Sequence, residues 1–123
     1  MRPGSRIFYV EDDKDLSDMV TIKLEKLGFC VCGRADNAED AITGIQNKNP
    51  DLVLLDIELQ GKYEGLSVGD FLVSKTDIPF IYTSGHDDKR ILEVARKTVP
   101  DGFLLKPFND NQLRVAIEMA ARQ

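Results

Sequence analysis

The sequence predicts an α/β fold: a single, doubly wound, five-stranded parallel sheet with helices on both faces. Three observations lead to this prediction. Short apolar segments rich in β-branched and aromatic residues recur five times along the chain. A segment with helical periodicity follows each of them. The length of 123 residues suits one domain that buries a core of its own.

The predicted strands are short and bounded by turn residues. They span residues 6–10, 29–34, 51–56, 78–84 and 102–106. The last three are apolar without alternation, which is typical of strands that are covered on both faces. Pro79 stands at the start of the fourth strand, where a missing N–H group is tolerated.

Apolar stripes at helical spacing predict the helices. These span residues 16–27, 37–48, 66–75, 87–97 and 110–120. Asp36, with Glu39 three residues later, is predicted to cap the second helix, and Asn109 is predicted to cap the fifth. Asn49 and Pro50 end the second helix because the residue before a proline disfavours the helical conformation.

Strand–helix–strand connections are right-handed crossovers, and this restricts the order of the strands. The flavodoxin-like order 2-1-3-4-5 is the natural prediction for five such units. In this arrangement a functional site is expected at the carboxyl ends of the strands.

Composition narrows the class of protein. The chain is 42% hydrophobic and 30% charged, with a formal net charge of −5. Its basic residues are scattered, so direct nucleic-acid binding by this chain is not expected. No apolar run approaches the roughly 20 residues of a membrane span, and the start lacks the apolar segment of a signal peptide. A cytoplasmic protein with no membrane association is therefore expected.

Cys30 and Cys32 lack the spacing of a zinc site, and we expect two small apolar fillers in a reducing compartment. A single domain is expected to cover residues 1–123, with the fold itself in about residues 6–122. Residues 1–5 (MRPGS) are expected to be a disordered start or a cloning remnant.

Polar side chains stand at the carboxyl ends of four predicted strands. They are Glu11, Asp12 and Asp13 after the first strand, Asp56 at the end of the third, Thr83 and Ser84 at the end of the fourth, and Lys106 at the end of the fifth. Clustered carboxylates repel one another unless a cation lies among them, and oxygen ligands favour Mg²⁺ or Ca²⁺. A carboxylate is also a nucleophile that forms an aspartyl phosphate. A hydroxyl and a lysine suit the other phosphoryl oxygens.

Four motifs in this order, IFYVEDD, LVLLD, IPFIYTSG and FLLKPF, resemble those of the receiver domain of two-component response regulators. The resemblance covers essentially the whole chain. No single motif is specific, but the four together are a strong signal. The resemblance implies a Mg²⁺-dependent phosphoacceptor, with Mn²⁺ as an alternative and Ca²⁺ as a crystallisation substitute. Such a domain catalyses its own phosphorylation and dephosphorylation and is not a metabolic enzyme.

The resemblance also implies a role for each residue of the site. Asp56 is the implied phosphoacceptor, and Ser84 and Lys106 are implied to engage the phosphoryl group. The implied metal ligands are Glu11, Asp12, Asp56 and the main-chain carbonyl of Glu58. The implied switch residues are Ser84 and Phe103, the implied modulators of dephosphorylation are Glu58 and His86, and Lys106–Pro107 is an implied cis peptide bond.

Some residues depart from the commonest pattern of the family. Glu11 replaces the commoner Asp, and Ser84 and Phe103 replace the commoner Thr and Tyr. The loop IELQGKYEGLS is longer than usual and lacks the usual proline, which bears on the position of Glu58.

The resemblance implies partners as well. The phosphodonor would be a histidine kinase or a histidine phosphotransfer protein. An output domain or target protein would contact the face made by the fourth helix, fifth strand and fifth helix, and activation would allow a homodimer.

Other interpretations compete with this one. The chain would be a pseudo-receiver if it bound partners without taking a phosphoryl group. An aspartate-nucleophile phosphatase would carry its nucleophile after the first strand, and a flavin carrier would have hydroxyls and amides there. Among single residues, Asp13 is expected to be mainly a negatively charged side chain that stabilises a helix N-terminus. His86 would otherwise be a surface loop residue and Phe103 plain core.

Overall fold

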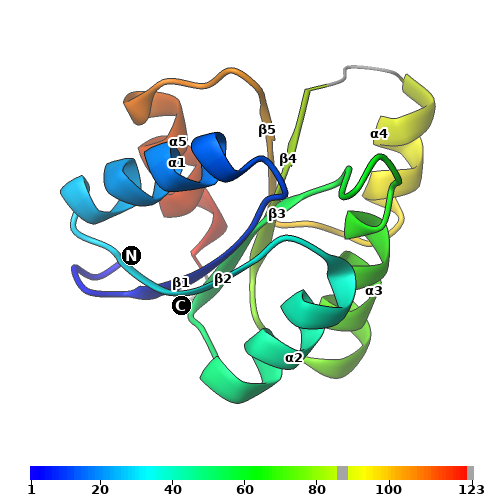
Figure 1. Cartoon of the computed structure of the whole chain (residues 1–123), viewed down its shortest axis with the longest axis horizontal. Helices are drawn as coiled ribbons and strands as arrows, with labels where there is room; N and C mark the ends of the chain where they lie inside the picture. The colour runs from blue at the N-terminus through cyan, green and yellow to red at the C-terminus, as the bar shows by residue number, and fades with distance from the viewer. Residues whose placement is uncertain (86–88, 122–123) are drawn as a thin grey trace.

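Strands and helices alternate along the chain in the computed structural model (Figure 1), which describes residues 1–85 and 89–121. The strands are β1 (Arg6–Val10), β2 (Cys30–Ala35), β3 (Leu52–Asp56), β4 (Phe80–Ser84) and β5 (Gly102–Leu105). The helices are α1 (Lys14–Lys26), α2 (Ala38–Lys48), α3 (Gly65–Lys75), α4 (Lys89–Arg96) and α5 (Asp110–Ala120). The predicted alternation is confirmed, with element ends shifted by one or two residues.

All the strands belong to one parallel sheet with the order β2-β1-β3-β4-β5, as predicted. The register aligns the ends of the central strands. Asp56 of β3 pairs with Thr83 of β4, and Ser84 pairs with Leu105 of β5. The residues that follow these strands therefore meet along one edge of the sheet.

Two layers of helices cover the sheet: α1 and α5 lie on one face, and α2, α3 and α4 lie on the other (Figure 1). Side chains alternate between the two faces along each strand. Leu52 and Leu54 of β3 pack with α1 and α5, while Val53 and Leu55 pack with α2 and α3. All five residues of β3 are buried, which explains its continuous apolar sequence.

One predicted helix cap is wrong. Asn37, not Asp36, caps α2, because Asn37 has extended backbone angles and its side chain accepts a hydrogen bond from the Asp40 N–H. The other predicted cap is confirmed. Asn109 and Gln112 form a capping box at the start of α5.

The two cysteines differ in exposure, and only Cys32 fits the expected role of an apolar filler. Cys30 and Cys32 are free thiols, with Cys30 exposed and Cys32 partly buried. Among the described residues, no helix has both the length and the apolar character that crossing a membrane requires.

Candidate functional site

Three carboxylates converge at the carboxyl edge of the sheet. One oxygen each from Glu11, Asp12 and Asp56 lies within 4.8 Å of the other two. Glu11 and Asp56 are only 3% and 4% exposed, whereas Asp12 is open to solvent. A depression of about 230 Å³ over the cluster is lined by Glu11, Asp12, Asp13, Asp56, Glu58, Gly85 and Lys106. The fold thus brings together the acidic residues that the sequence singled out.

Lys106 bridges two of these carboxylates. Its Nζ donates hydrogen bonds to Glu11 Oε1 at 2.6 Å and to Asp56 Oδ2 at 2.7 Å. The lysine follows β5, and its own N–H donates to the Ser84 carbonyl oxygen at 2.8 Å, which extends the sheet pairing to this position. The Lys106–Pro107 peptide bond is cis, as predicted.

Main-chain N–H groups orient the buried carboxylates. The Glu58 N–H donates to Asp56 Oδ1 at 3.0 Å, and the Asp13 N–H donates to Glu11 Oε2 at 3.1 Å. Both oxygens of Glu11 and both oxygens of Asp56 therefore accept a hydrogen bond. Asp13 itself caps α1 through its side chain, which accepts from the Leu16 N–H. This is the helix-terminal role expected of it.

The turn after β3 orients the exposed carboxylate. The N–H of Gln60 donates to Asp12 Oδ2 at 2.8 Å. The side-chain amide of Gln60 donates to the main-chain oxygen of Asp36 at 3.0 Å. Neither contact was predicted, because a main-chain donor in an irregular loop leaves no signature in a sequence.

Burial dominates the electrostatics of the cluster. It raises the pKa of Glu11 to about 7, although the hydrogen bond from Lys106 acts in the opposite direction. Burial alone would lower the pKa of Lys106, but its hydrogen bonds to Asp56 and Glu11 outweigh this and raise it. The ammonium therefore stays charged, and the site holds more negative charge than one lysine neutralises.

The other predicted site residues take different positions. Ser84 ends β4 and is 2% exposed. Phe103 of β5 is partly buried against the side chains on the α2, α3 and α4 face. Glu58 lines the depression together with the carboxylates. His86 lies outside the described residues.

Two hydroxyls are buried near the site; the sequence placed Thr83 at this edge but did not single out Tyr9. Tyr9 of β1 and Thr83 of β4 are fully buried, and neither hydroxyl has a hydrogen-bond partner among the described residues. Burial, followed by the charges of Glu11 and Asp56, raises the pKa of Tyr9, so its phenol stays protonated. Tyr9 stands within an apolar strand segment, which is why the sequence did not separate it from the core. Each residue is the next to last of its strand, and this position is the signal that places it beside the carboxylates.

A glycine allows the close approach of α3 to the cluster. The N–H of Gly65 donates to the Ile57 carbonyl oxygen at 2.9 Å. A Cβ atom at this position would overlap the main-chain oxygen of Asp56 and come within 2.7 Å of the Ile57 Cα. The start of α3 can therefore lie against the end of β3 only if residue 65 has no side chain.

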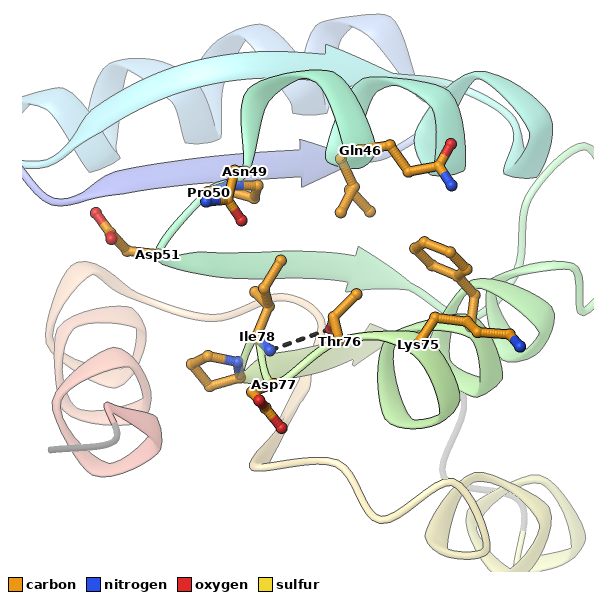
Figure 2. A pocket seen from close by; sticks show the side chains of 11 residues that line it. Gln46, Asn49, Pro50, Asp51, Lys75, Thr76, Asp77 and Ile78 are labelled. Atoms are coloured by element: carbon orange, nitrogen blue, oxygen red, sulfur yellow. Dashed lines mark hydrogen bonds between the residues drawn. The ribbon is translucent and has the colours of Figure 1, made fainter.

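A separate pocket of about 490 Å³ lies at the opposite edge of the sheet, between the end of α2 and the segment that precedes β4 (Figure 2). Gln46, Asp51, Lys75 and Asp77 contribute its polar groups, and the Ile78 N–H donates to Thr76 Oγ1 at 3.1 Å beside it. Its charged groups do not converge as those at the carboxyl edge do. The carboxylate cluster is therefore the candidate site.

The comparisons with known proteins identify the family. Residues 7–118 match the response regulator receiver domain. The chain belongs to this family. It is a receiver domain of two-component signal transduction.

The relatives of this receiver domain are regulators. The transcriptional regulatory protein KdpE of Staphylococcus aureus is 32% identical over 118 residues, which is 96% of this chain and 50% of KdpE. The DNA-binding response regulator MtrA of Mycobacterium tuberculosis is 30% identical over 118 residues, covering 96% of this chain and 51% of MtrA. The chain therefore spans about half the length of these curated relatives.

Solved structures agree on the fold of the receiver domain. The signal receiver domain of a modulated diguanylate cyclase from Desulfovibrio desulfuricans G20 superposes with a TM-score of 0.87 at 32% identity, covering 95% of this chain and 93% of that one. A CheY-like receiver domain protein from Methanospirillum hungatei JF-1 superposes with a TM-score of 0.84 at 25% identity, covering 94% of this chain and 91% of that one.

These relatives overturn one expectation. The scattered basic residues led to the prediction that this chain does not bind nucleic acid directly, and the relatives contradict that exclusion. MtrA is named a DNA-binding response regulator, and this chain covers only about half of it. The charge of a receiver domain carries no information about a segment outside it, so it does not exclude DNA binding.

Proposed function

We propose that Asp56 accepts a phosphoryl group from a histidine kinase in a Mg²⁺-dependent reaction, and that the acyl phosphate switches a protein-interaction surface. One observation carries the proposal. The Lys106 ammonium contacts the carboxylate of Asp56 directly, inside a cluster of three carboxylates at the edge of a receiver fold. Such a set supplies the positioning and charge neutralisation that phosphoryl transfer requires.

The contacts of Asp56 suit a nucleophile. The Glu58 N–H holds Oδ1 and Lys106 holds Oδ2, so the carboxylate is oriented before a donor arrives. In the transfer, an Asp56 oxygen forms a bond to phosphorus while the bond from phosphorus to the donor imidazole nitrogen breaks. The electron pair of that bond leaves with the imidazole. Lys106 then balances negative charge on the transferred group.

The residues present fit a hard divalent cation. All three clustered side chains offer carboxylate oxygens, the ligands that Mg²⁺ prefers. The raised pKa of Glu11 has burial as its main cause, and a second positive charge would favour its ionised form. Glu11, Asp12 and Asp56 would hold the ion, together with the main-chain carbonyl of Glu58. A bound Mg²⁺ would neutralise charge on the phosphoryl oxygens.

The remaining roles follow from the same chemistry. We assign Ser84 as the hydroxyl that engages the phosphoryl group and Phe103 as the aromatic side chain that responds to it. Ser84 ends β4, and Phe103 lies on the neighbouring strand β5, where it pairs with Tyr82. Glu58 and His86 are proposed to control the access of water to the acyl phosphate.

Intact mass spectrometry tests the proposal. The protein is incubated with acetyl phosphate, with Mg²⁺ or with EDTA, as wild type and as Asp56→Asn. We expect a single phosphoryl adduct on the wild type that needs Mg²⁺ and is absent from the variant. An adduct that survives in Asp56→Asn would identify another acceptor. A wild type that takes neither the phosphoryl group nor beryllofluoride would be a module that signals by binding alone.

A further inference from the structure

The segment between β3 and α3 contains a miniature hairpin. Leu59 and Lys62 exchange two main-chain hydrogen bonds, 2.7 Å from Leu59 N to Lys62 O and 3.0 Å from Lys62 N to Leu59 O. The two residues between them, Gln60 and Gly61, have φ angles of 56° and 72°. Positive φ at both central positions is the requirement of a type I′ turn. Leu59 is fully buried, so the base of the turn is anchored in the core.

The tip of this hairpin connects two other segments of the site. The Gln60 N–H donates to the Asp12 carboxylate, 48 positions away in the chain. The Gln60 side chain donates to the main-chain oxygen of Asp36, 24 positions away. One residue therefore joins the end of β1, the link between β2 and α2, and the loop after β3.

Asp12 depends on this contact more than the other carboxylates do. Glu11 and Asp56 are buried and each contacts Lys106, but Asp12 is exposed to solvent. The Gln60 N–H donates to Oδ2 of Asp12, the carboxylate that also belongs to the cluster. Hydrogen-bond donors behind a metal-ligating carboxylate orient it, and their loss commonly weakens metal binding by about tenfold or more.

The conformation of the turn sets the position of the donor. A residue with a Cβ atom disfavours positive φ, most strongly when the side chain is β-branched. Glycine accepts this conformation freely, and asparagine is tolerated in it. The Gln60 N–H points at Asp12 only while the I′ turn keeps its shape.

We propose that Gln60 is a positioning residue for the cation site, and that its main-chain N–H, held by the I′ turn, orients the Asp12 carboxylate toward a divalent ion. The proposal rests on the proposed function, because it concerns the metal-dependent step of that reaction. It assigns to the loop after β3 a part in metal affinity that is separate from the chemistry at Asp56.

The test compares variants that keep or distort the turn. Gln60→Gly keeps positive φ and the N–H but removes the side-chain amide, whereas Gln60→Val disfavours positive φ. Mn²⁺ and Mg²⁺ affinities are measured by isothermal titration calorimetry without a phosphodonor, and melting temperatures report on folding. The phosphorylation rate with acetyl phosphate is then followed against Mg²⁺ concentration.

We expect Gln60→Val to bind Mn²⁺ about tenfold more weakly and Gln60→Gly to stay within about threefold of wild type. At saturating Mg²⁺ the maximal phosphorylation rate of Gln60→Val should approach that of wild type, because Asp56 and Lys106 are untouched. If Gln60→Val binds Mn²⁺ as tightly as wild type, or if Gln60→Gly loses as much affinity as Gln60→Val, the proposal is overturned.

A second measurement covers the case in which Gln60→Val does not fold. Exchanging the amide before residue 60 for an ester removes the N–H and keeps the glutamine side chain, with the same exchange before Gly61 as control. Only the exchange at residue 60 should weaken Mn²⁺ binding; equal losses would overturn the proposal. A wild type that binds Mn²⁺ normally but takes neither the phosphoryl group nor beryllofluoride would refute the proposed function and leave this inference standing.

Discussion

Replacing Lys106 by methionine tests the electrostatic description of the site. The substitution keeps most of the apolar stem and removes the ammonium that contacts Glu11 at 2.6 Å and Asp56 at 2.7 Å. The two carboxylate side chains are only 1% and 5% exposed, and that of the lysine is 20% exposed. The variant therefore leaves two nearly buried carboxylates without their shared cation.

The size of the effect follows from this burial. Breaking a buried ion pair by removing one partner costs about 3–5 kcal/mol. Part of that cost is relieved when Glu11, whose pKa burial has already raised to about 7, takes up a proton. We therefore expect Lys106→Met to lose about 3 kcal/mol of unfolding free energy near pH 8 and clearly less near pH 6.

Urea denaturation in EDTA, near pH 6 and near pH 8, measures both values. Lys14→Met is the matched control, because the Lys14 side chain is 86% exposed and its pairing with Asp18 lies at the surface; it should unfold like the wild type. Mg²⁺ should restore more stability to Lys106→Met than to the wild type, since a bound cation replaces the lost charge. An unchanged urea midpoint near pH 8, or an equal loss at both pH values, would refute the reasoning.

Two further predictions concern the same cluster. Burial raises the pKa of Glu11 from 4.5 to about 7. Between these two pH values the folded protein keeps a proton on Glu11 that the unfolded chain has released, so a rise in pH favours unfolding. Its unfolding free energy in EDTA should fall by about 2 kcal/mol between about pH 5 and pH 8; urea titrations of Glu11→Gln should lack this part of the pH dependence, and an identical profile would contradict it. Gly65→Ala places a Cβ atom against the main-chain oxygen of Asp56, so it should cost about 2–4 kcal/mol in thermal or urea unfolding. Gly85→Ala, where an added Cβ meets nothing within 4 Å, is the control, and equal losses in the two variants would remove the steric explanation.

Much of the fold was predictable because its sequence signals agree with one another. The unbroken apolar run from Leu52 to Leu55 could be accommodated only between two helical layers, and all five residues of β3 are buried. Asp56 and Lys106 were predictable as neighbours because parallel strands place their carboxyl ends at a common edge. The structure adds that the Lys106 ammonium contacts both Asp56 and Glu11.

The parts that were not predictable depend on main-chain geometry. The Gln60 N–H reaches Asp12 because two consecutive residues adopt positive φ, and only Gly61 signals this in the sequence. Asp36 and Asn37 are both of residue types that cap helices well, and only the backbone conformation at Asn37 decides between them.

The ion pairs of Lys106 also bear on how the chain folds. The lysine contacts one carboxylate 95 positions earlier in the chain and another 50 positions earlier. A partly folded state in which β5 has not paired with β4 would carry both carboxylates without their counterion. The interactions that build the site therefore penalise incomplete states and sharpen the cooperativity of the folding transition. Glu11 follows β1, Asp56 ends β3 and Lys106 follows β5. A ligand that contacts all three residues would bind only the complete fold, so its binding free energy would add to global rather than local stability.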